Sequence, residues 1–275
     1  MAHLLLDLRW MVPGYTGGME WSARSLVEAL LRPEINPPGR HEITLLLPGV
    51  TRYDFDLRRR PDFHLQVSDG PQSYLDQIAW RLHGCPVGAP PATWVNGRKT
   101  VASIALSYSG MIEADLYPLK NLVVVHDLQH EYLPEFFSPQ ELANRQRDLA
   151  ASLAQAGRVI AISEFTRQSL LERHNLVPER CRVIYQASHT LFEQPPSEPE
   201  VVWRKYGLTP GNYLYYPSNT WFHKNHRLIL QALALLREQG QPDFLLVCSG
   251  APKEAHPDLL ALCRGLGLEA QFRFL

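Results

Sequence analysis

A lone lysine in a polar loop is the residue of this sequence best suited to bind an anion. The segment from Tyr215 to His226 predicts a strand and then a polar loop that contains Lys224. An amphipathic helix is expected to follow over Arg227 to Glu238. Because the N-terminus of a helix is the positive end of its dipole and offers free backbone amides, it binds phosphate groups well. The pattern therefore predicts a ligand that carries phosphate.

A glycine-rich loop near the N-terminus is the second candidate. Gly17 and Gly18 come just before a helix expected over Glu20 to Leu31, where a backbone without Cβ atoms can approach a phosphate or a sugar. The alternative is an ordinary tight turn between a strand and a helix. The segment matches neither the dinucleotide fingerprint G-x-G-x-x-G nor the P-loop pattern, so the sequence does not favour a nicotinamide or ATP enzyme.

His126 and Asp127 follow an apolar strand expected over Leu122 to Val125. Ligands of open α/β sheets bind at the carboxyl ends of the strands. The imidazole could hydrogen-bond a sugar hydroxyl or transfer a proton, and Asp127 could orient the imidazole or cap the next turn. We interpret the pair as catalytic, with a polar loop tip as the alternative.

Ser163 stands at the end of another expected strand, Arg158 to Ile162, and before a helix expected over Glu164 to His174. Capping of that helix alone would explain the serine. Its place at the carboxyl end of a strand also makes it a candidate for contact with the ligand. No G-x-S-x-G elbow is present, so a hydrolase triad has no support in the sequence.

Pairs of histidines raise the question of a metal site. His126 and His130 are four residues apart, with acidic Asp127 and Glu131 beside them, and on a helix such a pair can share a cation. We expect His126 in a loop instead, because a strand precedes it and Pro134 follows soon after. We therefore predict no metal. For His223 and His226 a solvated or capping role is expected.

Composition excludes several classes of protein. A formal net charge of -1 over 275 residues gives no general attraction to nucleic acid. The four cysteines are scattered, with no C-x-x-C pair and no signal peptide, so we expect neither disulfides nor zinc and place the protein in the cytoplasm. No apolar run approaches the roughly 20 residues that cross a bilayer, so any membrane contact would be peripheral.

The order of apolar segments predicts an α/β protein with parallel sheets. Continuous apolar runs alternate with helical patterns along the chain, as in sheets that are covered on both faces. A stretch rich in Pro and Ser near residue 195 predicts a linker. We assign residues 1–187 to a first domain, 188–207 to the linker and 208–275 to a second domain. The second domain has few expected strands, so we expect part of it to be missing.

Four segments, taken in order, resemble the retaining glycosyltransferases of family 4, which have the GT-B fold. They are Gly17 with Gly18, Val125 to Leu128, Ile162 to Thr166, and Trp221 to His226. The resemblance implies two Rossmann-like domains that face a cleft. The first domain would hold a saccharide or lipid-linked acceptor, and the second a nucleotide-diphosphate sugar. It implies no cofactor or metal, and transfer by same-face attack without a protein nucleophile.

Site residues follow from this resemblance. Lys224 corresponds to the lysine that binds the donor diphosphate, and His126 to a histidine near the transferred sugar. The full set of predicted donor-binding residues is Gly17, Gly18, Ser163, Ser218, Asn219, Lys224 and Gly250, with His126 and Asp127 as catalytic residues.

The sequence departs from the family pattern at two places. Ser218 stands where many members have an arginine, and a serine supplies no charge. A pair of acidic residues of the family would fall after Leu275, so we expect the chain to be a fragment. One alternative is a noncatalytic module that binds a nucleotide-sugar or a saccharide. Another is a related phosphorylase or epimerase.

Overall fold

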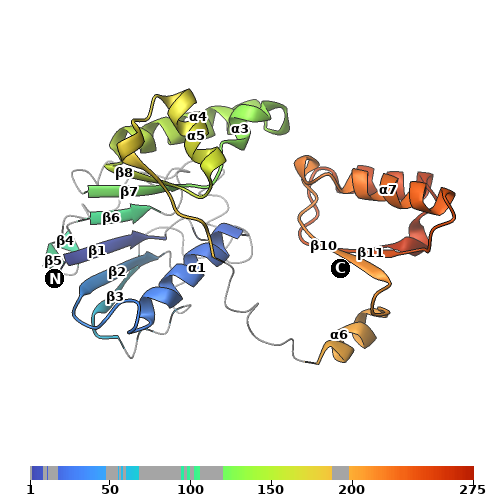
Figure 1. Ribbon diagram of the computed structural model, residues 1–275, viewed down its shortest axis with the longest axis horizontal. Coiled ribbons are helices and arrows are strands. Elements are labelled where there is room, and N and C mark those ends of the chain that lie inside the picture. The colour runs from blue at the N-terminus through green and yellow to red at the C-terminus, as the bar shows by residue number, and fades with distance from the viewer. Residues whose placement is uncertain are drawn as a thin grey trace. The chain divides into compact units, whose positions relative to one another are not determined.

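The computed structural model divides into two compact units, Met1–Glu193 and Gln194–Leu275 (Figure 1). The structure describes residues 2–8, 11, 18–47, 55, 57, 60–67, 94–95, 98–99, 102–105, 120–187 and 198–275. Among these residues, no helix combines the length and apolar character needed to cross a membrane.

The first unit is built on a seven-stranded sheet with the order β3-β2-β1-β6-β7-β8-β9. Every pairing in it is parallel. Its strands are β1 (Ala2–Asp7), β2 (His41–Leu47), β3 (Phe63–Val67), β6 (Ala102–Ala105), β7 (Lys120–Val125), β8 (Arg158–Ala161) and β9 (Cys181–Val183). A separate antiparallel pair joins β4 (Trp94–Val95) and β5 (Arg98–Lys99). Parallel strands place all their carboxyl ends at one edge of the sheet, and the candidate residues follow those ends.

The helices described in the first unit are α1 (Gly18–Leu31), α3 (Gln129–Tyr132), α4 (Pro139–Gln155) and α5 (Glu164–His174), with 3-10 turns at Pro134–Phe136 and Pro178–Arg180. Helices α1, α4 and α5 contribute apolar residues to the core on this sheet. Val27 of α1 and Leu149 of α4 are fully buried together with Leu45 and Val123 of the strands. This continuous apolar core holds the helix starts in place at the sheet edge.

The second unit has a parallel sheet of its own with the order β10-β11-β12. The strands are β10 (Tyr213–Pro217), β11 (Leu245–Ser249) and β12 (Phe272–Phe274), and the helices are α6 (Pro199–Tyr206), α7 (His226–Glu238) and α8 (His256–Gly265), with 3-10 turns at Phe222–Lys224 and Glu269–Gln271. Leu230, Leu246, Cys248 and Leu259 form a second buried core. Figure 1 shows α7 running along β10 and β11.

The α/β class and the parallel sheets expected from the sequence are confirmed. One expectation needs correction, because the range 188–207 is not wholly a linker. Residues 188–197 lie outside the described residues, but Pro199–Tyr206 form helix α6. Proline at the first position favours the start of a helix, and Gly207 ends it with a left-handed conformation (φ 58°). The proline that suggested a stiff linker instead begins a helix.

Candidate functional site

Adjacent strands bring two of the predicted residues to one edge of the first sheet. Val125 of β7 pairs with Ala161 of β8, so His126 and Ser163 follow neighbouring strand ends. Thr166 links them: its hydroxyl donates to the backbone oxygen of His126 (3.3 Å), and its backbone amide donates to Ser163 Oγ (3.1 Å). Ser163 is therefore the N-cap of α5, which is one of the two roles that the sequence suggests for it. Its contact with a ligand stays a prediction.

The imidazole of His126 is held by an amide from a third strand end. Gln186, which follows β9, places Nε2 3.2 Å from His126 Nδ1 and 2.8 Å from Ser22 Oγ of α1. The two protons of the amide can serve both acceptors. Because Nδ1 accepts a hydrogen bond, the ring proton is on Nε2. Gln186 and Ser22 were not predicted from the sequence, since a single Gln after a three-residue strand has no motif around it.

Asp127 caps a turn rather than orienting His126. Its Oδ1 accepts a hydrogen bond from the backbone amide of Gln129 (3.1 Å), the first residue of α3. The carboxylate is exposed, so its other oxygen is accessible to a ligand. A catalytic role for Asp127 remains a prediction.

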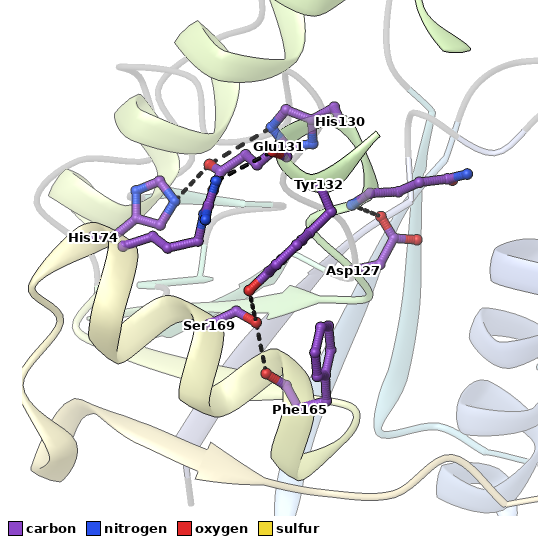
Figure 2. Close-up of polar contacts among 9 residues, drawn as sticks. Asp127, His130, Glu131, Tyr132, Phe165, Ser169 and His174 are labelled. Atoms are coloured by element: carbon purple, nitrogen blue, oxygen red, sulfur yellow. Dashed lines mark hydrogen bonds and ion pairs between the residues drawn. The ribbon is translucent and has the colours of Figure 1, made fainter. Parts of the chain in front are cut away.

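Helix α3 is joined to α5 by the carboxylate of Glu131 (Figure 2). Glu131 forms an ion pair with Arg173 (2.8 Å) and a hydrogen bond with His174 (2.7 Å). His130 is fully buried, and this burial lowers its pKa below the usual value of 6.5. His126 is in the loop before α3 and His130 is on α3, so the two are not on one helical face. Among the described residues, no group of three or more His, Cys, Asp or Glu is arranged to hold a metal ion.

The glycine-rich loop lies mostly outside the part of the chain that the structure describes. Gly17 is one of the residues not described, so its predicted role stays a prediction. Gly18 begins α1, and it is exposed. A Cβ atom added at Gly18 would meet no other atom within 4 Å, so packing does not require a glycine there.

Two loops of the second unit are locked together at the ends of β10 and β11. The Ser218 amide donates to Ser249 O (2.8 Å), and the Ala251 amide donates to Asn219 Oδ1 (2.7 Å). Thr220 is fully buried, and its hydroxyl accepts from the Lys253 amide (2.6 Å). Asn219, predicted to bind the donor, thus uses its carbonyl oxygen to fix the loop.

Gly250 allows this close approach. Its φ is +139°, and a Cβ atom there would lie 2.8 Å from backbone atoms of Ser218 and Asn219. Only glycine fits both the conformation and the space. The structure therefore brings together the predicted residues Ser218, Asn219 and Gly250.

Lys224 ends the 3-10 turn between β10 and α7 and is exposed. Tyr216 fixes its backbone, since the Tyr216 hydroxyl donates to Lys224 O (2.7 Å). Among the described residues, none forms an ion pair or a side-chain hydrogen bond with the Lys224 ammonium group. Asn225 caps α7 by accepting from the Leu228 amide (3.3 Å). The lysine is thus presented on a fixed backbone and is available to an anion.

The start of α7 concentrates positive charge. Its first turn contains no acidic residue, and the basic residues His223, Lys224 and Arg227 surround it. Basic groups at the positive end of a helix dipole repel it, and a bound anion would relieve that repulsion. His226, the first residue of α7, is buried, and burial lowers its pKa below 6.5.

A pocket of about 270 Å³ opens beside the N-terminal ends of α7 and α8. Trp221, His226, Arg227 and Asp258 are among its lining residues, whereas Lys224 is not. The pocket is therefore next to the cationic loop but distinct from the place where the lysine is presented.

Comparison with known proteins defines the fold of the molecule. No family model matches the sequence, and no curated protein is similar to it in sequence. The solved structure of HepE from Anabaena, in complex with UDP and glucose, is similar with a TM-score of 0.61 and 18% identity, over 100% of this chain and 69% of that chain. WaaG, a glycosyltransferase involved in lipopolysaccharide biosynthesis, has a TM-score of 0.58 and 16% identity, over 99% and 69%.

A third similar structure is the catalytic domain of starch synthase IV from Arabidopsis thaliana, bound to ADP and acarbose. Its TM-score is 0.59 with 12% identity, over 100% of this chain and 74% of that chain. These structures are GT-B glycosyltransferases, and the chain has the GT-B fold. The share of 69% agrees with a second domain that this chain represents only in part.

Proposed function

We propose that the chain belongs to a glycosyltransferase that moves a sugar from a nucleotide-diphosphate sugar to a saccharide or lipid-linked acceptor, with retention of configuration. The observation that carries the proposal is the exposed Lys224 beside an α7 start that has basic but no acidic residues. HepE, which shares the fold, has been solved with UDP and with UDP-glucose, and this supports a nucleotide-sugar as the ligand. No observation favours a noncatalytic binding module.

In this proposal the second unit stabilises the leaving group. A nucleoside diphosphate gains negative charge as its bond to the sugar breaks. Lys224 and the amides at the start of α7 would stabilise that charge, and Gly250 keeps the loop close to the β11 end. Ser218 contributes no charge, so Lys224 carries more of this role than it would beside an arginine.

The first unit supplies His126. Since its Nδ1 accepts from Gln186, its Nε2 is a hydrogen-bond donor, suited to a hydroxyl oxygen of the transferred sugar. Attack of the acceptor on the face that the diphosphate leaves would retain configuration. We further propose a cytoplasmic enzyme of polysaccharide assembly that needs no metal, with at most peripheral membrane contact.

Substitution of Lys224 tests the proposal directly. We expect Lys224→Ala to weaken UDP binding by about 10- to 100-fold, the scale of a lost charge-assisted hydrogen bond. Isothermal titration calorimetry of the whole chain with UDP measures this change. Lys205→Ala, which removes an exposed lysine from α6, is the matched control and should leave the affinity unchanged. Equal affinity of wild type and Lys224→Ala would contradict the proposal.

A further inference from the structure

Two exposed aromatic rings lie side by side in the first unit, on the helices that follow His126 and Ser163. The ring centroids of Tyr132 on α3 and Phe165 on α5 are 5.3 Å apart, and 41% of Tyr132 and 66% of Phe165 are exposed. We propose that this pair is the platform on which an uncharged acceptor saccharide stacks. The inference rests on the proposed function, because it assigns the acceptor side of that reaction.

Polar contacts hold the side chain of Tyr132 in place (Figure 2). Ser169 Oγ donates to Phe165 O (2.8 Å), so the Tyr132 hydroxyl donates to Ser169 Oγ (2.8 Å). The guanidinium carbon of Arg173 lies 4.6 Å from the centre of the Tyr132 ring. Glu131 holds Arg173 in turn. The orientation of Tyr132 is therefore fixed before any ligand binds, which reduces the entropy lost on binding.

The pair is connected to the predicted catalytic residues through short stretches of chain. Phe165 precedes Thr166, whose hydroxyl bonds the backbone of His126 (3.3 Å). Asp127 accepts a hydrogen bond from the amide of Gln129, the first residue of the helix α3 that carries Tyr132. Figure 2 shows Asp127, Tyr132 and Phe165 around the same strand ends. The rings are thus on the two helices that begin at the same sheet edge as His126 and the exposed Asp127.

The combination of groups indicates the class of ligand. The apolar face of a sugar ring stacks on an aromatic ring, while a carboxylate and an imidazole bind its hydroxyl groups. The carboxylates of Asp127 and Glu164 are exposed, whereas Glu131 is paired with Arg173, the cation that lies over the Tyr132 ring. A neutral saccharide fits these groups better than an anionic lipid surface.

Binding of oligosaccharides to the whole chain tests the inference. The probes are cellotetraose, maltotetraose and chitotetraose, observed by saturation-transfer NMR and titrated in the millimolar range. We expect at least one of them to bind, with Phe165→Ala weakening it by about tenfold, as for a lost aromatic contact, and Phe165→Trp restoring it. Phe136→Ala removes another exposed aromatic ring of this unit and should bind as wild type does.

Titration with UDP separates this inference from the proposed function. Phe165→Ala should keep the UDP affinity of the wild type, and circular dichroism should show that it is folded. The inference is overturned if none of the three probes binds, or if Phe165→Ala binds them as wild type does. It is also overturned if Phe165→Ala abolishes self-association without changing saccharide binding, because the rings would then form a protein contact. If Lys224→Ala bound UDP as tightly as wild type does, that result would instead contradict the proposed donor site.

Discussion

At the scale of single residues, an amide rather than a carboxylate orients the imidazole of His126. A carboxylate at Nδ1 would stabilise the protonated ring, as in hydrolase triads. Gln186 donates to Nδ1 and so favours the tautomer with its proton on Nε2. Nε2 of His126 is therefore suited to donate a hydrogen bond to a sugar.

We expect His126→Ala to lower kcat by about 10- to 100-fold, as for a lost hydrogen bond in the transition state, with little change in UDP affinity. Release of UDP from a UDP-sugar in the presence of acceptor measures kcat. Gln186→Leu should cause a smaller loss in the same direction, and ¹⁵N NMR should show that His126 no longer favours the Nε2–H form. Gln168→Leu, on the exposed face of α5, is the control. Equal losses in kcat and UDP affinity would mean that His126 only binds the donor.

The sequence predicts the positions of these residues better than their partners. His126 and Ser163 were placed at strand ends because apolar runs precede them, and the structure agrees. The role of Asp127 could not be chosen from the sequence. Capping the next turn and orienting the His126 imidazole both require an aspartate at this position. The position of Gln186 depends on β9, and the three residues of this strand form no recognisable apolar run.

At the scale of elements, the second unit depends on contact between the loop after β10 and the loop after β11. We expect Gly250→Ala to destabilise this unit by about 1–3 kcal/mol, because an added Cβ strains the backbone and collides with Ser218 and Asn219. Urea denaturation measures the loss, and UDP affinity should fall with it. Gly240→Ala is the matched control: its φ is also positive (+67°), but a Cβ there meets no atom within 4 Å. If both variants lose the same stability, backbone strain alone explains the effect.

Elements with clear end signals were predicted well. The helix expected from Glu164 to His174 has these bounds in the structure, because Ser163 caps its start. Strands β3 and β9 and helix α6 were not predicted. They are short, and the apolar periodicity that identifies an element is weak over so few residues.

At the scale of the whole molecule, two separate apolar cores predict two unfolding transitions. Leu149 is fully buried in the first core and Leu230 in the second. We expect Leu149→Ala to destabilise only the first unit and Leu230→Ala only the second, each by about 2–5 kcal/mol, because each leaves a cavity. Calorimetry of the wild type and both variants assigns the transitions. One shared transition that both variants lower equally would contradict independent units.

The fold itself was predictable because strands, helices and polar strand ends follow one another along the whole chain in the order that the fold requires. The GT-B class does not depend on any one motif. The number of strands was less predictable, since seven parallel strands in the first sheet include short ones that only their neighbours stabilise.

The buried cysteines give each core a chemical reporter. Cys181 belongs to the first core, and Cys248 and Cys263 to the second. Burial raises the pKa of Cys248 to about 11, and only the thiolate reacts with alkylating reagents. The thiol is thus protected twice, by lack of access and by protonation. The rate at which Cys248 is alkylated therefore reports how often the unit that presents Lys224 opens.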